Sequence, residues 1–328
     1  MDQIVTTVFL GQPLWMWLGF IGVVAALLAF DLGVLHRGSK EIGVRESLTL
    51  SAGYITLGVA FGGFIWLQLG QQAGIEYLTG FVVEKSLAMD NVFVIALIFG
   101  YFAIPRAYQH RVLFWGILGV IVLRAIMIGL GATLVAEFGW VLYLFAAFLI
   151  LTGVKMLMAG DKEPDLSANP ALKLLRRRLR VTDDLHGDRF VVRLPDPKTG
   201  KLAKFATPML LALIVIEVAD LVFAVDSVPA IFAITTDPYL VYTSNIFAIL
   251  GLRALYFALA AVLHRFAYLK QALAVLLVFI GSKVFVADLL GLGKFPAAWS
   301  LAITFLILFA GVAYSLWRTR DGAQAAAR

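Results

Sequence analysis

Cysteine is absent from this chain of 328 residues, and charged side chains make up only 15% of it. The lack of cysteine excludes disulfides and thiolate metal ligands. The scarcity of charge, together with 61% hydrophobic residues and a mean hydropathy of +0.91, excludes an ordinary soluble domain. Several apolar runs exceed the roughly 18 to 20 residues that cross a bilayer. The composition therefore predicts an all-α, polytopic membrane protein.

Other features are missing as well. The chain has no Gly-x-x-x-x-Gly-Lys-Ser/Thr motif, so ATP-driven transport is not expected. We also do not expect the protein to be an enzyme. No basic segment precedes the first apolar run, so no cleaved signal peptide is expected. The four histidines lie between the apolar runs or at their ends, which leaves no imidazole ligand for zinc or copper deep within the membrane.

The hydropathy pattern predicts about nine transmembrane helices, at 13–35, 47–69, 77–101, 109–135, 138–159, 205–234, 241–263, 271–291 and 297–317. These define an N-terminal membrane half (1–159), a loop (160–204), a C-terminal membrane half (205–317) and a tail (318–328). The loop holds eleven Lys and Arg, whereas the connections on the opposite side hold only Lys294. Because positive residues favour the cytoplasm, we expect a bacterial inner-membrane protein with its N-terminus outside and its C-terminus inside.

The loop 160–204 is predicted to carry a short basic helix at 170–180 and a small β-hairpin at 189–205. Its positive charge, which accounts for most of the net charge of +6, lies beside anionic lipid and is not read as a nucleic-acid site. A solvated connector between the two membrane halves is the preferred interpretation.

Two of the expected helices each carry two acids separated by five residues, Glu84 and Asp90 in one and Asp220 and Asp226 in the other. An ionised carboxylate in hydrocarbon costs several kcal/mol unless it is paired, hydrated or bound to a cation. The two acid pairs therefore predict a cation pathway near the middle of the membrane.

The order of charged residues within the spans also occurs twice. The two copies read Glu84, Asp90, Arg124 and Lys155, and then Asp220, Asp226, Arg253 and Lys283. Since each copy covers three spans, an odd number, the second copy would be inverted relative to the first. Inverted three-helix repeats are typical of transporters whose substrate site lies at the midplane. Coincidental similarity between apolar helices is the alternative.

The candidate cation ligands are all oxygen donors: Glu84, Asp90, Asn91, Glu217, Asp220 and Asp226. Such a set suits Mn²⁺, Mg²⁺ or Ca²⁺ and suits zinc and copper poorly. We expect Arg124, Arg253 and Lys283 to act as counter-ions or gating residues. Asp31, late in the first span, is predicted either to line the inner mouth of the path or to cap a helix near the surface.

On straight helices the two acids of a pair lie roughly 120° apart and do not both reach one ion comfortably. Pro229 removes a helical hydrogen bond next to Asp226 and predicts a break in that helix. No equivalent proline follows Asp90.

Three stretches, 84–99, 217–234 and 244–257, resemble the TerC family of membrane proteins, and within it the Alx-like branch. The resemblance covers nearly all of residues 13–317. It implies inverted three-helix repeats and a role in metal homeostasis, with manganese efflux and tellurium resistance associated with members. Carried over by position, it implies metal handling by the six oxygen donors named above, with Ser244 and Asn245 as weaker additions.

The leading hypothesis is thus a secondary transporter that exports Mn²⁺, with protons as a candidate counter-ion. A membrane scaffold of a metal or tellurite stress complex, with the basic loop docking partners, is the alternative from another class. Oxyanion export is a third hypothesis, since Arg124, Arg253 and Lys283 could line an anion path. An intramembrane aspartyl protease is disfavoured, because no Gly-x-Gly-Asp signature lies in the helices.

Overall fold

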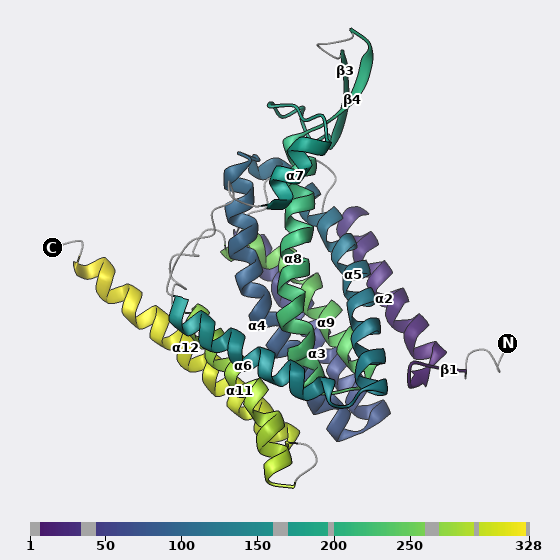
Figure 1. The fold of residues 1–328 in the computed structure, drawn as a ribbon, viewed down its shortest axis with the longest axis vertical. Helices are drawn as coiled ribbons and strands as arrows, with labels where there is room; N and C mark the ends of the chain where they lie inside the picture. Colours follow the sequence, from purple (N-terminus) through teal and green to yellow (C-terminus); the bar gives the residue numbers. More distant parts are fainter. Residues whose placement is uncertain are drawn as a thin grey trace.

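The protein is an all-α membrane bundle with two small β-hairpins, as the computed structural model in Figure 1 shows. The structure describes residues 7–33, 44–159, 170–195, 200–259, 269–291 and 295–325. The long helices are α2 (Leu14–Gly33), α3 (Val44–Leu69), α4 (Gln71–Tyr101), α5 (Arg106–Glu137), α6 (Val141–Ala159), α8 (Pro208–Phe232), α11 (Leu269–Leu289) and α12 (Ala297–Ala325). The shorter helices are α7 (Pro170–Arg178), α9 (Pro238–Leu250) and α10 (Leu252–Leu259).

Within the described residues, seven helices are long and apolar enough to cross a membrane, and Leu14–Phe30 forms a shorter apolar helix. The polytopic all-α class predicted from composition is confirmed. Helix α4 has 31 residues but carries four charged side chains, so its composition alone does not mark it as a span. The count of nine spans stays a prediction.

A β-hairpin projects beyond one end of the bundle, which we call the hairpin end (Figure 1). Strand β3 (Val191–Pro195) pairs with β4 (Leu202–Ala206) in antiparallel register, close to the strands expected from the sequence. Arg111 of α5 forms an ion pair with Asp188, and its guanidinium lies 5.5 Å from the centre of the Phe190 ring. These contacts hold the base of the hairpin against the membrane bundle. A second, short hairpin, β1 (Val8–Phe9) with β2 (Gln12–Pro13), precedes α2.

The expected break at Pro229 does not occur, because α8 continues as a helix through Pro229 to Phe232. The interruption lies instead at Gly251, between α9 and α10. There the ammonium of Lys85 donates a hydrogen bond of 3.0 Å to the carbonyl of Ala248. A Cβ on Gly251 would come within 2.6 Å of that ammonium, so the glycine leaves the space that the lysine needs. A charged donor thus satisfies a carbonyl in the last turn of α9, where carbonyls lose their helical partners.

Helices α4 and α8 lie at the centre of the bundle. Helix α4 contacts α3, α8, α9 and α12, and α8 contacts α4, α5 and α6. Helices α6, α11 and α12 gather on one side (Figure 1). Each of the two acid-bearing helices is therefore in contact with at least three others, which shields its buried charges from lipid.

Helices α6 and α11 pack closely through reciprocal glycine contacts. A Cβ built on Gly153 would lie 2.6 Å from the Ala274 carbonyl oxygen, and one on Gly281 would lie 2.5 Å from that of Ala146. Small residues at such crossings let helix backbones approach in a membrane. The two glycines occupy matching places in the two sequence copies, and this mutual contact is what a two-fold relation between α6 and α11 would produce. The inverted repeat itself stays a prediction.

Adding a methyl group at these two glycines should destabilise the fold. We expect Gly153→Ala and Gly281→Ala each to cost about 1–3 kcal/mol, because the backbones must separate to admit the Cβ. Thermal unfolding of the detergent-solubilised chain, followed by tryptophan fluorescence, measures the effect. Gly129→Ala is the matched control, since nothing lies within 4 Å of its Cβ position. Equal unfolding temperatures for all three variants would contradict the close packing.

Candidate functional site: a buried acid pair bridged by one arginine

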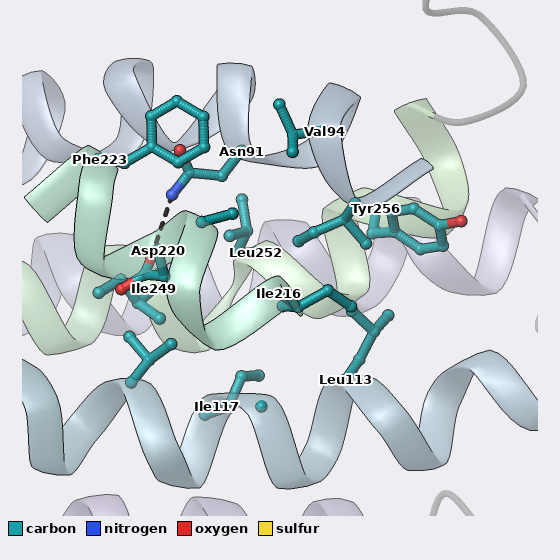
Figure 2. A pocket seen from close by; sticks show the side chains of 14 residues that line it. Asn91, Val94, Leu113, Ile117, Ile216, Asp220, Phe223, Ile249, Leu252 and Tyr256 are labelled. Atoms are coloured by element: carbon teal, nitrogen blue, oxygen red, sulfur yellow. Dashed lines mark hydrogen bonds between the residues drawn. The ribbon is translucent and has the colours of Figure 1, made fainter. Parts of the chain in front are cut away.

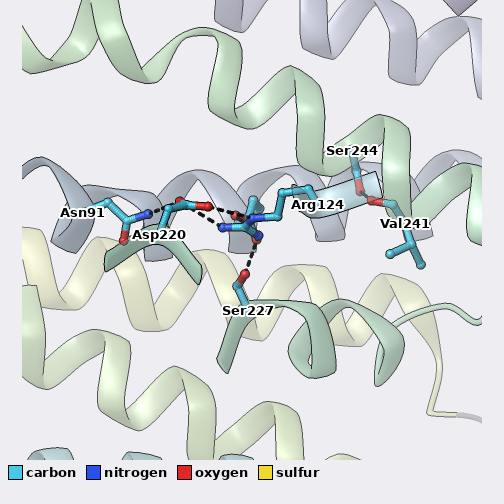
Figure 3. A network of polar contacts seen from close by, with 7 residues as sticks. Asn91, Arg124, Asp220, Ser227, Val241 and Ser244 are labelled. Atoms are coloured by element: carbon cyan, nitrogen blue, oxygen red, sulfur yellow. Dashed lines mark hydrogen bonds and ion pairs between the residues drawn. The ribbon is translucent and has the colours of Figure 1, made fainter. Parts of the chain in front are cut away.

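Three helices bring one buried arginine and two acids together, and Figure 3 shows Arg124 beside Asp220. Arg124 of α5 lies between Glu84 of α4 and Asp220 of α8. Its Nη1 is 2.9 Å from Glu84 Oε1, and its Nε is 3.3 Å from Asp220 Oδ2. The first acids of the two sequence copies thus meet at one guanidinium, although they are far apart in the chain.

Two neutral side chains extend this network. The amide of Asn91 donates to Asp220 Oδ1 at 3.2 Å, and Arg124 Nη1 donates to the Ser227 hydroxyl at 2.6 Å. Asn91 stands seven residues after Glu84, and Ser227 stands seven after Asp220, so each pair shares one face of its helix. Asn91 was among the predicted site residues, whereas Ser227 was not, although the seven-residue spacing was the signal for both.

The network is almost completely buried, and its charges do not balance. Glu84 and Arg124 are each 1% exposed, and Asp220 is 7% exposed. Two carboxylates face one guanidinium, so the described cluster carries one excess negative charge when both acids are ionised. Two oxygen atoms, Glu84 Oε2 and Asn91 Oδ1, are buried without a hydrogen-bond partner in the described part of the chain. Unpartnered buried acceptors are costly, and a bound cation or water would satisfy them.

Glu217 lies one turn of α8 before Asp220, against the glycines of α5. A Cβ built on Gly119 would overlap the Glu217 carboxyl group, so this glycine makes the room that the acid occupies. Glu217 is partly buried, and its Oε2 has no hydrogen-bond partner among the described residues. It therefore adds a further acceptor near the cluster without being tied to Arg124.

Two small cavities flank the Asn91–Asp220 contact. The first, of about 40 Å³, extends toward the hairpin end and is walled mainly by apolar side chains, including Leu113 and Ile216 (Figure 2). We call it the hairpin-side cavity. The second, of about 60 Å³, is lined by Glu84, Asn91, Arg124 and Ser227, together with Met156 and other apolar side chains. We call it the central cavity. Each has room for one or more water molecules, so polar atoms of the cluster face space on both sides.

The structure does not gather all the predicted residues here. Lys283, expected as a counter-ion, lies away from the acids, and its ammonium donates to the Ser300 hydroxyl at 2.9 Å. Ser244 bonds to the Val241 carbonyl, and Asn245 is fully buried on α9 with no hydrogen-bond partner in the described region. The side chains of Asp31, Asp90, Asp226 and Arg253 lie outside the described residues. Among the side chains described, no three His, Asp or Glu residues are grouped so that they could hold a metal ion as they stand.

The comparisons with known proteins assign the chain to a family. The model for "Integral membrane protein TerC family" matches residues 69–323, so the chain belongs to the TerC family. It is 46% identical over 316 residues to a protein of Escherichia coli K12, provisionally named membrane-bound redox modulator Alx, covering 94% of this chain and 95% of that one. It is 44% identical over 310 residues to an uncharacterised membrane protein of Myxococcus xanthus, covering 94% of each. No solved structure matches the chain.

Removing the guanidinium should destabilise the bundle, because two buried carboxylates would lose their counter-charge. We expect Arg124→Gln to lower the free energy of unfolding by about 3–5 kcal/mol. Adding Glu84→Gln and Asp220→Asn to that variant should restore much of the loss, since no charge then remains to be compensated. Thermal unfolding in detergent measures both effects. Arg176→Gln on the exposed face of α7 is the control and should be neutral. If the Arg124→Gln variant is as stable as the parent, Arg124 does not stabilise the bundle by compensating the charge of the two acids.

Proposed function

We propose that this protein is a secondary-active transporter that exports divalent metal cations, with Mn²⁺ as the main substrate. The observation that carries the proposal is the buried pair Glu84 and Asp220, held by one arginine between two cavities. An ion pair with a purely structural role is expected to have balanced charges and no cavity beside it. This cluster retains a negative excess and unpartnered oxygens next to space.

The chemistry of the cluster suits a hard or intermediate divalent ion. Carboxylate and amide oxygens from Glu84, Asn91 and Asp220 are ligands of the kind that Mn²⁺, Mg²⁺ and Ca²⁺ prefer. Met156 also lines the central cavity, and its thioether is a softer donor that would favour manganese over magnesium.

Arg124 gives the site a way to be closed without a bound metal. Its guanidinium neutralises half of the charge of the two acids, which otherwise would stand bare in a medium of low polarity. An incoming divalent ion competes with Arg124 for the same carboxylates, and its two positive charges replace the one that it displaces. When the ion leaves, Arg124 returns to the acids. Protons that titrate Glu84, Asp220 or Glu217 would serve as counter-substrate, because metal binding requires ionised carboxylates.

The positive charges of the loop 160–204 indicate the direction of transport across the membrane. Helix α7 ends in Arg176, Arg177 and Arg178, and it lies at the hairpin end. We infer that the hairpin end faces the cytoplasm of a bacterial inner membrane, by the preference of Lys and Arg for that side. The hairpin-side cavity then lies on the cytoplasmic side of the acids, and export runs from it toward the opposite end of the bundle.

The other functions have less support. An oxyanion would need a net positive path, whereas the described cluster is net negative and Lys283 lies outside it. The name of the Escherichia coli relative suggests a redox role, but this chain has no cysteine for thiol–disulfide exchange. A scaffold role predicts that the loop, and not the acids, carries the function.

Reconstitution into liposomes containing a manganese-sensitive dye tests the proposal. We expect Glu84→Gln and Asp220→Asn to slow Mn²⁺ flux at least about tenfold, the equivalent of about 1.4 kcal/mol in the transport barrier, because each removes a charged ligand. Glu137→Gln, an exposed acid at the end of α5, is the matched control and should transport like the parent chain.

The same assay extends to the residues that the sequence alone implicates. Asp90→Asn and Asp226→Asn should also reduce flux, whereas deletion of residues 161–200 should leave transport by the membrane bundle largely intact. If the four acid variants move Mn²⁺ as fast as the parent while the loop deletion abolishes function, the scaffold interpretation replaces the transporter.

A further inference from the structure

A third cavity, larger than the hairpin-side and central cavities, lies at the end of the bundle opposite the hairpin, away from the Arg124 cluster. Its volume is about 190 Å³, and its lining includes two buried side chains of opposite charge, Glu76 of α4 and Lys283 of α11. Exposed Asp288 and Thr236 also line it. We call it the Glu76 cavity.

Glu76 and Lys283 face the same space without pairing with each other. Glu76 is 7% exposed and Lys283 is 4% exposed, yet no ion pair within 4 Å joins them among the described residues. Each is instead held by a neutral partner. Gln72 donates to the Glu76 carboxylate at 2.8 Å, and the Lys283 ammonium donates to Ser300 at 2.9 Å. A carboxylate and an ammonium that are buried but separated across a cavity leave room for a mobile ion between them.

The Glu76 cavity and the central cavity share the same walls. Both are lined by residues of α4, α6, α8 or its C-terminal connection, and α11. Each of these helices places a fully buried apolar residue between the two linings, and four of these residues are Val83, Leu149, Ala230 and Ile280. These four belong to one hydrophobic cluster, and we call them the apolar layer. The reciprocal glycine contacts of α6 and α11 flank it, with Gly281 directly after Ile280. The two cavities therefore follow one another along the same four helices, with a close-packed apolar layer between them.

We propose that the Glu76 cavity is the release site for the exported divalent cation, with Glu76 as its transient ligand and Lys283 as the charge that expels it. This inference rests on the transporter function proposed above. Two acids and one ammonium give the lining a net negative charge, which favours a cation over an anion. A cation that passes the apolar layer meets Glu76, and the nearby ammonium of Lys283 competes with it for that carboxylate. Release follows because the ammonium cannot leave the cavity, whereas the metal ion can.

The absence of natural cysteine makes a direct test available in the full chain. A single cysteine at Thr236 would report on the cavity, and one at Trp140, which is 62% exposed at the same end, would report on the open surface. Right-side-out membrane vesicles are treated with two membrane-impermeant methanethiosulfonates of similar size, one carrying trimethylammonium and the other sulfonate. The ratio of their reaction rates at Thr236→Cys, divided by the ratio at Trp140→Cys, measures the charge preference of the cavity.

We expect the cationic reagent to be favoured about three- to fivefold at Thr236→Cys, the size expected for one net charge in a partly hydrated site. Glu76→Gln should bring the ratio close to that of the control, and Lys283→Met should raise it. Asp288→Asn, at an exposed position, should lower the ratio and serves where Glu76→Gln fails to fold. Millimolar Mn²⁺ should slow the cationic reagent at Thr236→Cys and leave Trp140→Cys unchanged. A cysteine at Leu149 in the apolar layer should not react.

Other results would overturn the inference. A preference for the anionic reagent at Thr236→Cys would show that the cavity attracts anions. Equal rates for the two reagents, with no slowing by Mn²⁺, would show that the cavity does not bind ions. Labelling requires no transport, so it separates this inference from the proposed function. Failure of Mn²⁺ flux with an intact cation preference would refute the transporter and leave an outer cation site. Normal flux without the preference would refute the release site alone.

Discussion

The structure depends on one guanidinium that is shared by acids from two distant parts of the chain. Arg124 joins α4, α5 and α8, and its burial means that none of the three helices can move away without exposing a charge to a medium that solvates it poorly. The pairing also makes the buried acids tolerable at all. Because one arginine does not balance two carboxylates, the arrangement remains receptive to additional positive charge, and this imbalance connects the stability of the bundle to its proposed transport function.

The cavities follow from the same constraint. Charged and amide side chains meet at the centre, and space remains on both sides of the Asn91–Asp220 contact. Toward the end opposite the hairpin, apolar side chains and the glycines of α6 and α11 close the bundle again before the Glu76 cavity opens. Polar and apolar levels thus alternate along these helices. A transporter needs such alternation, since a continuous polar path would conduct ions without coupling, and a continuous apolar core would admit none.

Membership of the TerC family agrees with the resemblance seen in three stretches of the sequence, because the matched region spans residues 69–323. One structural expectation requires correction. Helix α8 is not broken at Pro229, since a proline near a helix end loses only one backbone hydrogen bond and the remaining turns continue around it. Lys283 does not join the central acids, because its position on α11 lies nearer the far end of the bundle, where it faces Glu76 and Ser300. The sequence pattern did not predict the interruption at Gly251, because the glycine lies within a run of apolar residues. It also did not predict the hydrogen bond from Lys85 to that turn.

Hydropathy and the repeated acids were sufficient to predict the all-α membrane class and to single out Glu84, Asn91 and Asp220, which the structure brings together around Arg124. They sufficed because burying a charge in lipid is so costly that its mere presence in an apolar run is informative. What the sequence could not determine is which charges meet. That Glu84 shares Arg124 with Asp220, that Ser227 completes the network and that Glu76 faces Lys283 across a separate cavity all depend on how helices from different parts of the chain pack. Periodicity defines the faces of one helix, whereas only the tertiary structure decides which faces touch and where space is left between them.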